Sequence, residues 1–549
     1  MRRIWIAVGI TVILGVAAAT GSLLRPGATA FAAVSLAYLN TAPTARNDSD
    51  LGIITFAFGS WDALSSDTLR TSASPWKLAN AAMALQAADG DVALAGQTDI
   101  AALYRQFGFH SPASFGNWPD GLAQPTILTP VGQNVGFGGR NWPPIGATIG
   151  NIGCAACHSS VMYQADGAPD TSRVWLGAPN GSINLEAYTQ TLFSAVRDYG
   201  PDKSRLMDVV DLLYPDTDWR ETLTLRYAIL PALLTIVTER DAAYGRLLPF
   251  RASLAGATNG LDSLKNRLGM IPPGTVLTES IFNSVPDLGS RLWRTKLLNS
   301  GTYAIPGIDH TAAITAADIT PEHRRGLAGI IAYFTVPSMG VTNAVAASNI
   351  EDAMAITAWM QDYAPQPFPG NIDRALVPQG RNLYAANCAS CHGTYDDSLT
   401  APSLTSFPNW EGEIGTDPQR ARLLTAEIAD AVNAGFGDYI SARTVTGYTA
   451  PPLTGLWASA PYLHNGSIPT LWHMMRPDTR PAWFEVGGHR LDLARVGIDL
   501  APPIDYAPWS IPAEVDTTAF GLTNGGHGAG FDGLSEAEKA ALLEYLKLL

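Results

Sequence analysis

The sequence predicts a mainly α-helical protein with two domains and long loops, in which the first domain is enlarged by extra helices. Three observations predict this fold: segments with apolar residues at helical spacing, two copies of one cysteine motif, and a proline-rich break between them. The chain has 549 residues, more than a single hydrophobic core usually serves. Its 52 glycines and 38 prolines indicate long connecting loops.

The first segment, residues 1–33, has the features of an export signal or N-terminal anchor. Arg2 and Arg3 precede an apolar run from Ile4 to Ala19, and small residues suited to cleavage follow. The same stretch extends to the roughly 20 residues that a membrane span needs, so a retained anchor is the alternative. Either reading places the body of the protein outside the cytoplasm, periplasmic or secreted, or anchored to the inner membrane. We expect that no later stretch is long and apolar enough to span a membrane.

The charge of the chain bounds its partners. The formal net charge is −14, whereas a nucleic-acid-binding protein needs a basic surface. We therefore expect no nucleic acid partner. An acidic surface is compatible with a small redox protein as electron donor, because opposite charges steer such encounters.

All four cysteines fall in two copies of one pattern, in which two cysteines are separated by two residues and followed directly by histidine. The copies are Cys154-Ala155-Ala156-Cys157-His158 and Cys388-Ala389-Ser390-Cys391-His392. This is the attachment signature of c-type haem, in which two thiols form thioethers to the haem and the adjacent histidine reaches the iron. The sequence therefore predicts two covalently bound haem c groups, with His158 and His392 as proximal iron ligands.

Other uses of paired cysteines are less consistent with the pattern. An exported protein invites a disulfide framework, and a Cys-x-x-Cys pair also occurs in redox dithiols and structural zinc sites. None of these explains a histidine after both pairs. A structural calcium ion is a further cofactor that we consider.

The predicted elements of the first domain follow in chain order. We place an N-terminal haem domain at residues 34–363, with its haem at 154–158. Long helical patterns cover Asn184 to Tyr199 and Trp219 to Tyr244, and a further one with an acidic first turn covers Asn349 to Tyr363.

The second domain begins after a break. Residues 364–371 hold three prolines, which remove amide donors and fix φ, and predict a linker. A C-terminal cytochrome c domain is expected at residues 372–549, with its haem at 388–392. A helix from Ala375 to Ala386 leads into the motif. The pattern Ser535-Glu-Ala-Glu538 predicts a capping box that opens the last helix.

One run of the second domain resembles a known family. Ala460-Pro-Tyr-Leu-His-Asn-Gly-Ser467, followed by Thr470-Leu471, is similar to the second haem domain of bacterial dihaem cytochrome c peroxidases and of their relatives that mature tryptophan-derived cofactors. The overall pattern is most similar to the rubber oxygenase branch, in which a Gly-His segment, here Gly526-His527, and a terminal helix, here Glu538 to Lys547, follow.

This resemblance implies roles for several residues. It implies that His527 is the distal ligand of the second haem; the alternatives are a solvated loop histidine, or ligation by His464, His473, Met474 or Met475. It places His464 near the haem environment, whereas the other interpretation is a buried histidine that holds its loop. It also places Trp293 beside or between the haems as an electron relay, an ordinary core tryptophan being the alternative.

The first haem is the expected reaction centre, because no sixth ligand is evident near its motif. His110, His310 and His323 are scattered in the sequence. An iron site that is open on one side is what O2 or peroxide activation requires. We therefore expect a haem-dependent oxidoreductase, of the rubber-oxygenase-like dioxygenase or cytochrome c peroxidase type, acting with an unknown reductant or organic substrate. The alternative is a non-catalytic dihaem electron-transfer cytochrome.

Overall fold

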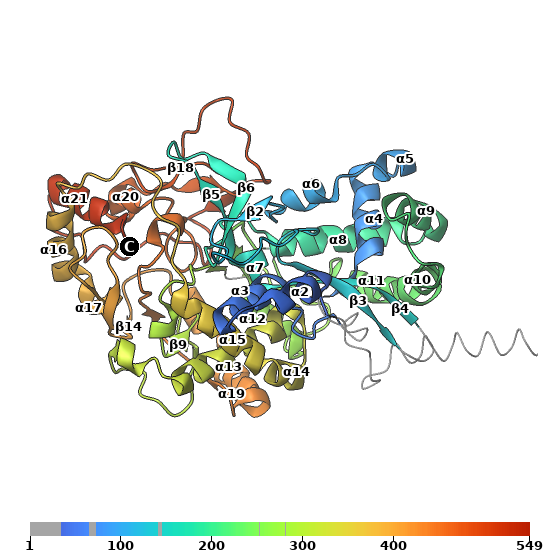
Figure 1. Cartoon of the computed structure of the whole chain (residues 1–549), viewed down its shortest axis with the longest axis horizontal. Helices are drawn as coiled ribbons and strands as arrows, with labels where there is room; N and C mark the ends of the chain where they lie inside the picture. Colours follow the sequence, from blue (N-terminus) through green and yellow to red (C-terminus); the bar gives the residue numbers. More distant parts are fainter. Residues whose placement is uncertain (1–33, 65–72, 141–144, 252, 280–281) are drawn as a thin grey trace, which may run out of the picture.

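The computed structural model describes residues 34–64, 73–140, 145–251, 253–279 and 282–549. The predicted export signal at residues 1–33 lies outside the described residues. The chain is mainly helical with short strands, as predicted. Figure 1 shows α7 near the middle of the molecule, α16, α17, α20 and α21 at one end, and α4 and α9 to α11 at the other.

The α-helices are α2 (Leu36–Thr41), α3 (Asp48–Phe58), α4 (Trp76–Ala87), α5 (Val92–Ala95), α6 (Ile100–Arg105), α7 (Cys154–Cys157), α8 (Leu185–Tyr199), α9 (Lys203–Leu213), α10 (Trp219–Thr224), α11 (Leu230–Tyr244), α12 (Gly260–Arg267), α13 (Pro321–Met339), α14 (Asn343–Ser348), α15 (Ile350–Asp362), α16 (Val377–Asn387), α17 (Ala389–His392), α18 (Gln419–Arg422), α19 (Ala426–Phe436), α20 (Leu471–Met474) and α21 (Glu536–Leu546). The other helical turns are η1 (Ala42–Thr44), the π-helix η3 (Leu225–Ile229), η4 (Arg291–Trp293), η5 (Ala316–Asp318), η6 (Leu456–Ala458) and η7 (Pro477–Thr479).

The strands are β1 (Ser74–Pro75), β2 (Ser114–Phe115), β3 (Gln133–Arg140), β4 (Ile145–Ile152), β5 (Ser159–Tyr163), β6 (Pro169–Leu176), β7 (Ala257–Thr258), β8 (Asn283–Ser284), β9 (Lys296–Leu297), β10 (Tyr303–Ala304), β11 (Ile314–Thr315), β12 (Thr394–Tyr395), β13 (Leu404–Phe407), β14 (Glu411–Gly412), β15 (Ser441–Ala442), β16 (Tyr448–Thr449), β17 (Trp483–Val486), β18 (Leu491–Asp492), β19 (Gly497–Ile498) and β20 (Ala513–Asp516). Nearly all pairs are antiparallel; β2 and β6 pair in parallel.

The central core joins both halves of the chain. Helix α3 packs along α15, and α13 packs against α15 on another side. Helix α19, which follows the second cysteine motif, contributes Ile428 and Val432 to this same core. Strand pairing makes the same connection, because Ile314 of β11 pairs with Phe407 of β13. The central core thus includes residues from both sides of residues 364–371. The division into two domains at this linker stays a prediction.

The predicted linker is extended and held in place. Residues 363–369 have no regular secondary structure. Trp457 donates its indole N–H to the Gln366 carbonyl at 2.8 Å, and Trp175 donates to the Ala364 carbonyl at 3.1 Å. The Phe368 ring contacts the Trp457 ring with centroids 5.6 Å apart. Its backbone groups and aromatic side chain thus tie this segment to both halves of the chain.

The long helical patterns of the first half form helices close to the predicted bounds. Asn184 caps α8 with its side chain, and α10, η3 and α11 continue one another from Trp219 to Tyr244. Among the described residues this Trp219–Tyr244 stretch is long and apolar enough to cross a membrane by length and composition, and 39% of its apolar part is buried. The expectation that no later segment reaches that length is wrong. A core helix of a soluble protein can have the same length and apolar composition.

The second half has its own core around α16, α20 and α21. The predicted helix before the second motif is α16, and the predicted final helix is α21. The capping box is confirmed: the Ser535 hydroxyl accepts from the Glu538 amide, and the Glu538 carboxylate accepts from the Ser535 amide at 2.8 Å. This core surrounds the second cysteine motif, because Cys388 and Ala389 pack against it.

Candidate haem sites

The first motif forms the short helix α7 between two hydrophobic cores. Cys154 packs on the central core and Cys157 on the core around α4 and α8. The ring of His158 faces the Pro286 carbonyl, with Nδ1 3.0 Å from its oxygen. A carbonyl only accepts, so Nδ1 carries the hydrogen and Nε2 remains available as a metal ligand. Burial lowers the pKa of His158 to about 4, which keeps the ring neutral, as ligation requires.

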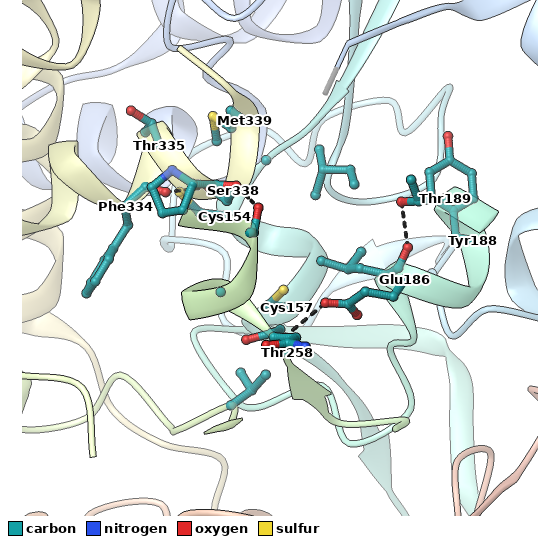
Figure 2. Close-up of a pocket in the computed structure, with 18 of the residues that line it drawn as sticks. Cys154, Cys157, Glu186, Tyr188, Thr189, Thr258, Phe334, Thr335, Ser338 and Met339 are labelled. Carbon is teal, nitrogen blue, oxygen red and sulfur yellow. Dashed lines mark hydrogen bonds between the residues drawn. The ribbon is translucent and has the colours of Figure 1, made fainter. Parts of the chain in front are cut away.

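A cavity of about 690 Å³ adjoins this motif and is lined by Cys154, Cys157 and His158. Figure 2 shows the two cysteines between labelled residues of α13 on one side and of α8 on the other. Most of the lining is aliphatic or aromatic. Among the described residues that line the cavity, His158 is the only histidine, and Met339 and Met360 carry the only thioethers.

Two polar side chains stand out in this apolar lining. Glu186 is buried, and its carboxylate accepts from the Asn259 amide at 3.0 Å and from the Ser253 hydroxyl. Burial raises the pKa of Glu186. Asn259 is 1% exposed, and its side-chain amide has no hydrogen-bond partner among the described residues. The cavity wall thus offers a carboxyl and an unpaired amide.

The second motif is arranged in the same way. His392 ends α17, and its Nδ1 lies 2.8 Å from the Pro451 carbonyl. Burial lowers the pKa of His392 to about 4. The ring of His527 lies close by, with the two ring centroids 5.9 Å apart. Two imidazoles that ligate one metal from opposite sides have centroids about 6 Å apart, because each metal–nitrogen bond is about 2 Å.

The loop that carries His527 is firmly attached. The His527 amide donates to the Ile414 carbonyl at 2.8 Å, and its φ of 54° lies in the left-handed region. Arg480 donates to the carbonyls of Asn524 at 2.5 Å and Gly526 at 2.9 Å. Nδ1 of His527 is buried and has no partner among the described residues. A loop fixed in this way presents its histidine in one orientation.

The alternative ligands of the second haem have other contacts. The Nδ1 atom of His473 lies 2.8 Å from the Thr470 hydroxyl. Met474 and Met475 are 7% and 1% exposed and belong to the hydrophobic core of the second half. His464 is stacked on Tyr448 with ring centroids 3.9 Å apart. Burial, with a contribution from Arg420, lowers the pKa of His464 to about 3, and its Nε2 has no partner among the described residues.

Trp293 lies on the short helix η4. Its neighbours Leu292 and Arg294 line the first cavity. The Trp293 ring packs instead against the core that also contacts Cys388. The segment 292–294 thus contributes Leu292 and Arg294 to the first cavity and Trp293 to the core of the second half.

The three other histidines of the first half, His110, His310 and His323, lie outside the lining of the first cavity. Nε2 of His110 lies 2.9 Å from the Ser159 carbonyl, and Nε2 of His323 lies 2.8 Å from the Leu292 carbonyl.

The donor set fits c-type haem at both motifs. All four cysteines are free thiols, and each pair is followed by a histidine whose Nδ1 is bound to a carbonyl. Burial raises the pKa of Cys154, Cys157 and Cys388 to about 12, which is unlike the activated thiol of a redox dithiol. Within the described residues there is no group of three or more His, Cys, Asp or Glu side chains placed to hold a metal ion. The calcium ion stays a prediction.

Several side chains of these sites could not be identified from the sequence. The carbonyls of Pro286 and Pro451 that orient the proximal histidines carry no residue signature. Glu186 and Asn259 lie on unrelated segments and meet only in the fold. Arg480 is one of many arginines, and its role depends on a loop more than forty residues away.

Two family models match parts of the second half. The model described as RoxA-like, cytochrome c-like matches residues 447–485, and the model of cytochrome c oxidase, cbb3-type, subunit III matches residues 375–447. The latter includes the motif at Cys388 to His392. Together the two matches cover the proximal histidine, the Pro451 carbonyl that holds it, and the run resembling the rubber oxygenases.

Two curated proteins of Sinorhizobium fredii (strain NBRC 101917 / NGR234) are similar to this chain. The uncharacterized protein y4iM is 34% identical over 178 residues, which is 27% of this chain and 39% of that protein. The uncharacterized protein y4iJ is 27% identical over 257 residues, 34% of this chain and 40% of that protein. The chain thus matches about two fifths of the length of each relative. The chain contains a cytochrome c-like region over residues 375–485, which implies covalently bound haem c and a redox role.

Proposed function

We propose that the protein is an exported dihaem c-type cytochrome oxidoreductase related to the dihaem cytochrome c peroxidases and the rubber oxygenases. The division of labour is that O2 or peroxide reacts at the first motif, while the second motif stores and relays electrons. Bound haem supplies the one-electron and O2 chemistry that no side chain can provide. The observation that carries the proposal is the difference between the two sites.

At the first site the chain offers one histidine and a large cavity. Cys154 and Cys157 would hold the haem covalently, and the Pro286 carbonyl keeps His158 oriented with Nε2 free. No second histidine lines this cavity among the described residues. Most of the cavity wall is apolar. Glu186, with its raised pKa, can hold a proton there, and the side-chain amide of Asn259 would be available to donate a hydrogen bond to a substrate.

At the second site the chain offers two histidines. His392 is oriented by the Pro451 carbonyl, and the His527 ring centroid lies 5.9 Å from that of His392, a separation suited to a shared metal. Two imidazole ligands hold iron low-spin and exclude substrate, as an electron-storage site requires. This supports His527, rather than His473 or the core methionines, as the distal ligand.

The residues between the sites complete the proposal. Trp293 packs on the second site's core from a segment whose neighbours line the first cavity, which supports its role as a relay. His464 is buried beside Tyr448 and is not among the residues that line the first cavity, which supports a role in holding the 463–467 loop. An acidic surface suits a basic redox protein as donor.

The second candidate function is a pure electron carrier with two six-coordinate irons. Met339 and Met360 line the first cavity, and a thioether is a known sixth ligand of haem c. The lining favours the enzyme, because no second histidine lines this cavity among the described residues, and two histidine ligands would exclude substrate from the iron.

Activity assays with matched variants test the proposal. Peroxide reduction with a reduced donor and O2-dependent cleavage of a polyisoprene are measured on the chain carrying both haems. His158→Ala is expected to abolish activity, whereas Met339→Leu and Met360→Leu retain it. Wild-type protein that is inactive in both assays and whose irons bind no cyanide would favour the electron carrier.

A further inference from the structure

Two arginine side chains are buried at the wall of the first cavity. Arg291 is 8% exposed and Arg294 is 3% exposed, and both line the cavity together with His158. They lie on and directly after η4. Burying a guanidinium costs several kcal/mol unless an anion or a full set of acceptors compensates.

Neither guanidinium has an ion-pair partner within 4.0 Å among the described residues. Arg291 donates from Nε to the Asp287 backbone carbonyl at 2.6 Å. Arg294 donates from Nη2 to the Leu298 carbonyl at 3.1 Å and to the Thr449 hydroxyl. These acceptors are neutral and satisfy only part of the five donors that each guanidinium carries.

The nearby acidic side chains form hydrogen bonds or ion pairs with other residues. The Asp287 carboxylate is the acid closest to Arg291, but it accepts from the Tyr363 hydroxyl at 3.0 Å and from the Gly289 amide at 2.6 Å. Burial raises the pKa of Asp287 to about 7, so it is only partly charged at neutral pH.

The other acid of this region is shared by two cations. The Glu411 carboxylate binds Lys296 at 2.5 Å and also Arg443. With Arg291 and Arg294 the described region holds four cations against the carboxylates of Asp287 and Glu411. These side chains carry a positive excess of at least two charges, because Asp287 is only partly charged, although the net charge of the protein is −14.

We propose that Arg291 and Arg294 bind the two propionate carboxylates of the haem attached at Cys154 and Cys157. Haem carries two carboxylates, which would balance the excess, and a guanidinium binds a carboxylate through paired, charge-assisted hydrogen bonds. The inference rests on the proposed function only in requiring a haem at the first motif. A free organic or inorganic anion in the same place is the alternative occupant.

The pairing has a consequence that does not depend on turnover. Cations beside the propionates favour the reduced iron, because reduction removes one positive charge from the haem. Loss of a guanidinium should therefore lower the midpoint potential of the first haem. The propionate left without a partner should take up a proton near neutral pH, which makes the potential more dependent on pH.

The experiment uses the full chain carrying its covalent haems. The haem content is first measured as the pyridine haemochrome, and the potential of each haem is then titrated in wild type, Arg291→Gln and Arg294→Gln. Arg291→Lys tests rescue, because it keeps the charge. Arg240→Gln is the matched control: Arg240 also lines the cavity, but it donates to Asn266 and lies over the Tyr244 ring. Resonance Raman spectra of the propionate bending modes are a second readout.

We expect both Gln variants to lower the potential of the first haem and to shift its propionate modes, with partial recovery in Arg291→Lys. Arg240→Gln should give a smaller change in potential and leave the propionate modes unshifted. Two haems with unshifted potentials and modes would overturn the inference while leaving the proposed function standing. A shift of the second haem alone would overturn the assignment to the first. Potentials of the wild type that change on adding acetate or phosphate would mean that the site holds a free anion. A chain with one haem contradicts the proposed function itself.

Discussion

Arg480 provides a sensitive test of the second site, because it binds the His527 loop without touching the ring itself. Its guanidinium donates to the carbonyls of Asn524 and Gly526 in that loop and to those of His473 and Met474 in α20. We expect Arg480→Gln to loosen His527 relative to His392. Hydrogen bonds to charged groups contribute about 1.5–3 kcal/mol each, and the lower value applies because Arg480 is only half-buried.

Losing the two hydrogen bonds to the loop should therefore cost about 3 kcal/mol. This free energy shifts the equilibrium between the attached and the detached loop about 100-fold toward the detached state. The second haem of Arg480→Gln should then bind carbon monoxide when reduced, whereas that of the wild type should not. His527→Ala removes the ligand completely and should convert the second haem to high spin, so it defines the largest change that Arg480→Gln can produce. Arg476→Gln is the control, because Arg476 binds the exposed Glu536 and makes no contact with the loop.

The outcomes distinguish errors in the ligand assignment, in the role of Arg480 and in the specificity of its contacts. A low-spin second haem in both His527→Ala and Arg480→Gln would refute the assignment of His527 as a ligand. A high-spin haem in His527→Ala together with an unaltered Arg480→Gln would show that the ligand is correct but that the arginine does not limit its position. Equal effects of Arg476→Gln and Arg480→Gln would refute the claim that the loop contacts are specific.

The other predictions concern attachment, capping and acidity. Replacing Cys388 and Cys391 by alanine should leave one covalent haem per chain, read as the pyridine haemochrome; two remaining haems would contradict the assignment. Ser535→Ala removes the capping box with Glu538 and should cost about 1 kcal/mol of unfolding free energy, measured by denaturant titration, and Ser535→Thr should restore most of it. Burial lowers the pKa of His464 from 6.5 to about 3, so only the unfolded chain binds its proton as pH falls through that window. Stability should fall by about 1.4 kcal/mol per pH unit there; His464→Gln should flatten the slope, and an unchanged slope would refute the linkage.

Features with a local cause could be predicted from the sequence. The capping box is set by residues three positions apart, and it forms as expected at Ser535 and Glu538. Helices α8 and α15 follow the apolar spacing of their own segments. The cysteine motifs are equally local, since two thiols and a histidine in five residues already specify the chemistry.

Features that depend on contacts between distant segments could not be predicted. Helix α19 follows the second motif yet packs with α13 to α15, because its apolar face meets a surface made by residues that precede that motif. The glycine-rich sequence before the first motif forms the antiparallel pair of β3 and β4, for which no strand is predicted from the sequence. The burial of Arg291 and Arg294 in a cavity wall has no sequence signal, since a buried and an exposed arginine look alike in a list of residues.

The central claim is that the two sites differ in their sixth ligand. Electron paramagnetic resonance of the purified chain, with and without cyanide, tests it most directly. The account predicts one low-spin iron with two histidine ligands, unaffected by cyanide, and one iron whose spectrum cyanide changes, in the resting or the half-reduced protein. Two low-spin irons that ignore cyanide in both states would contradict it.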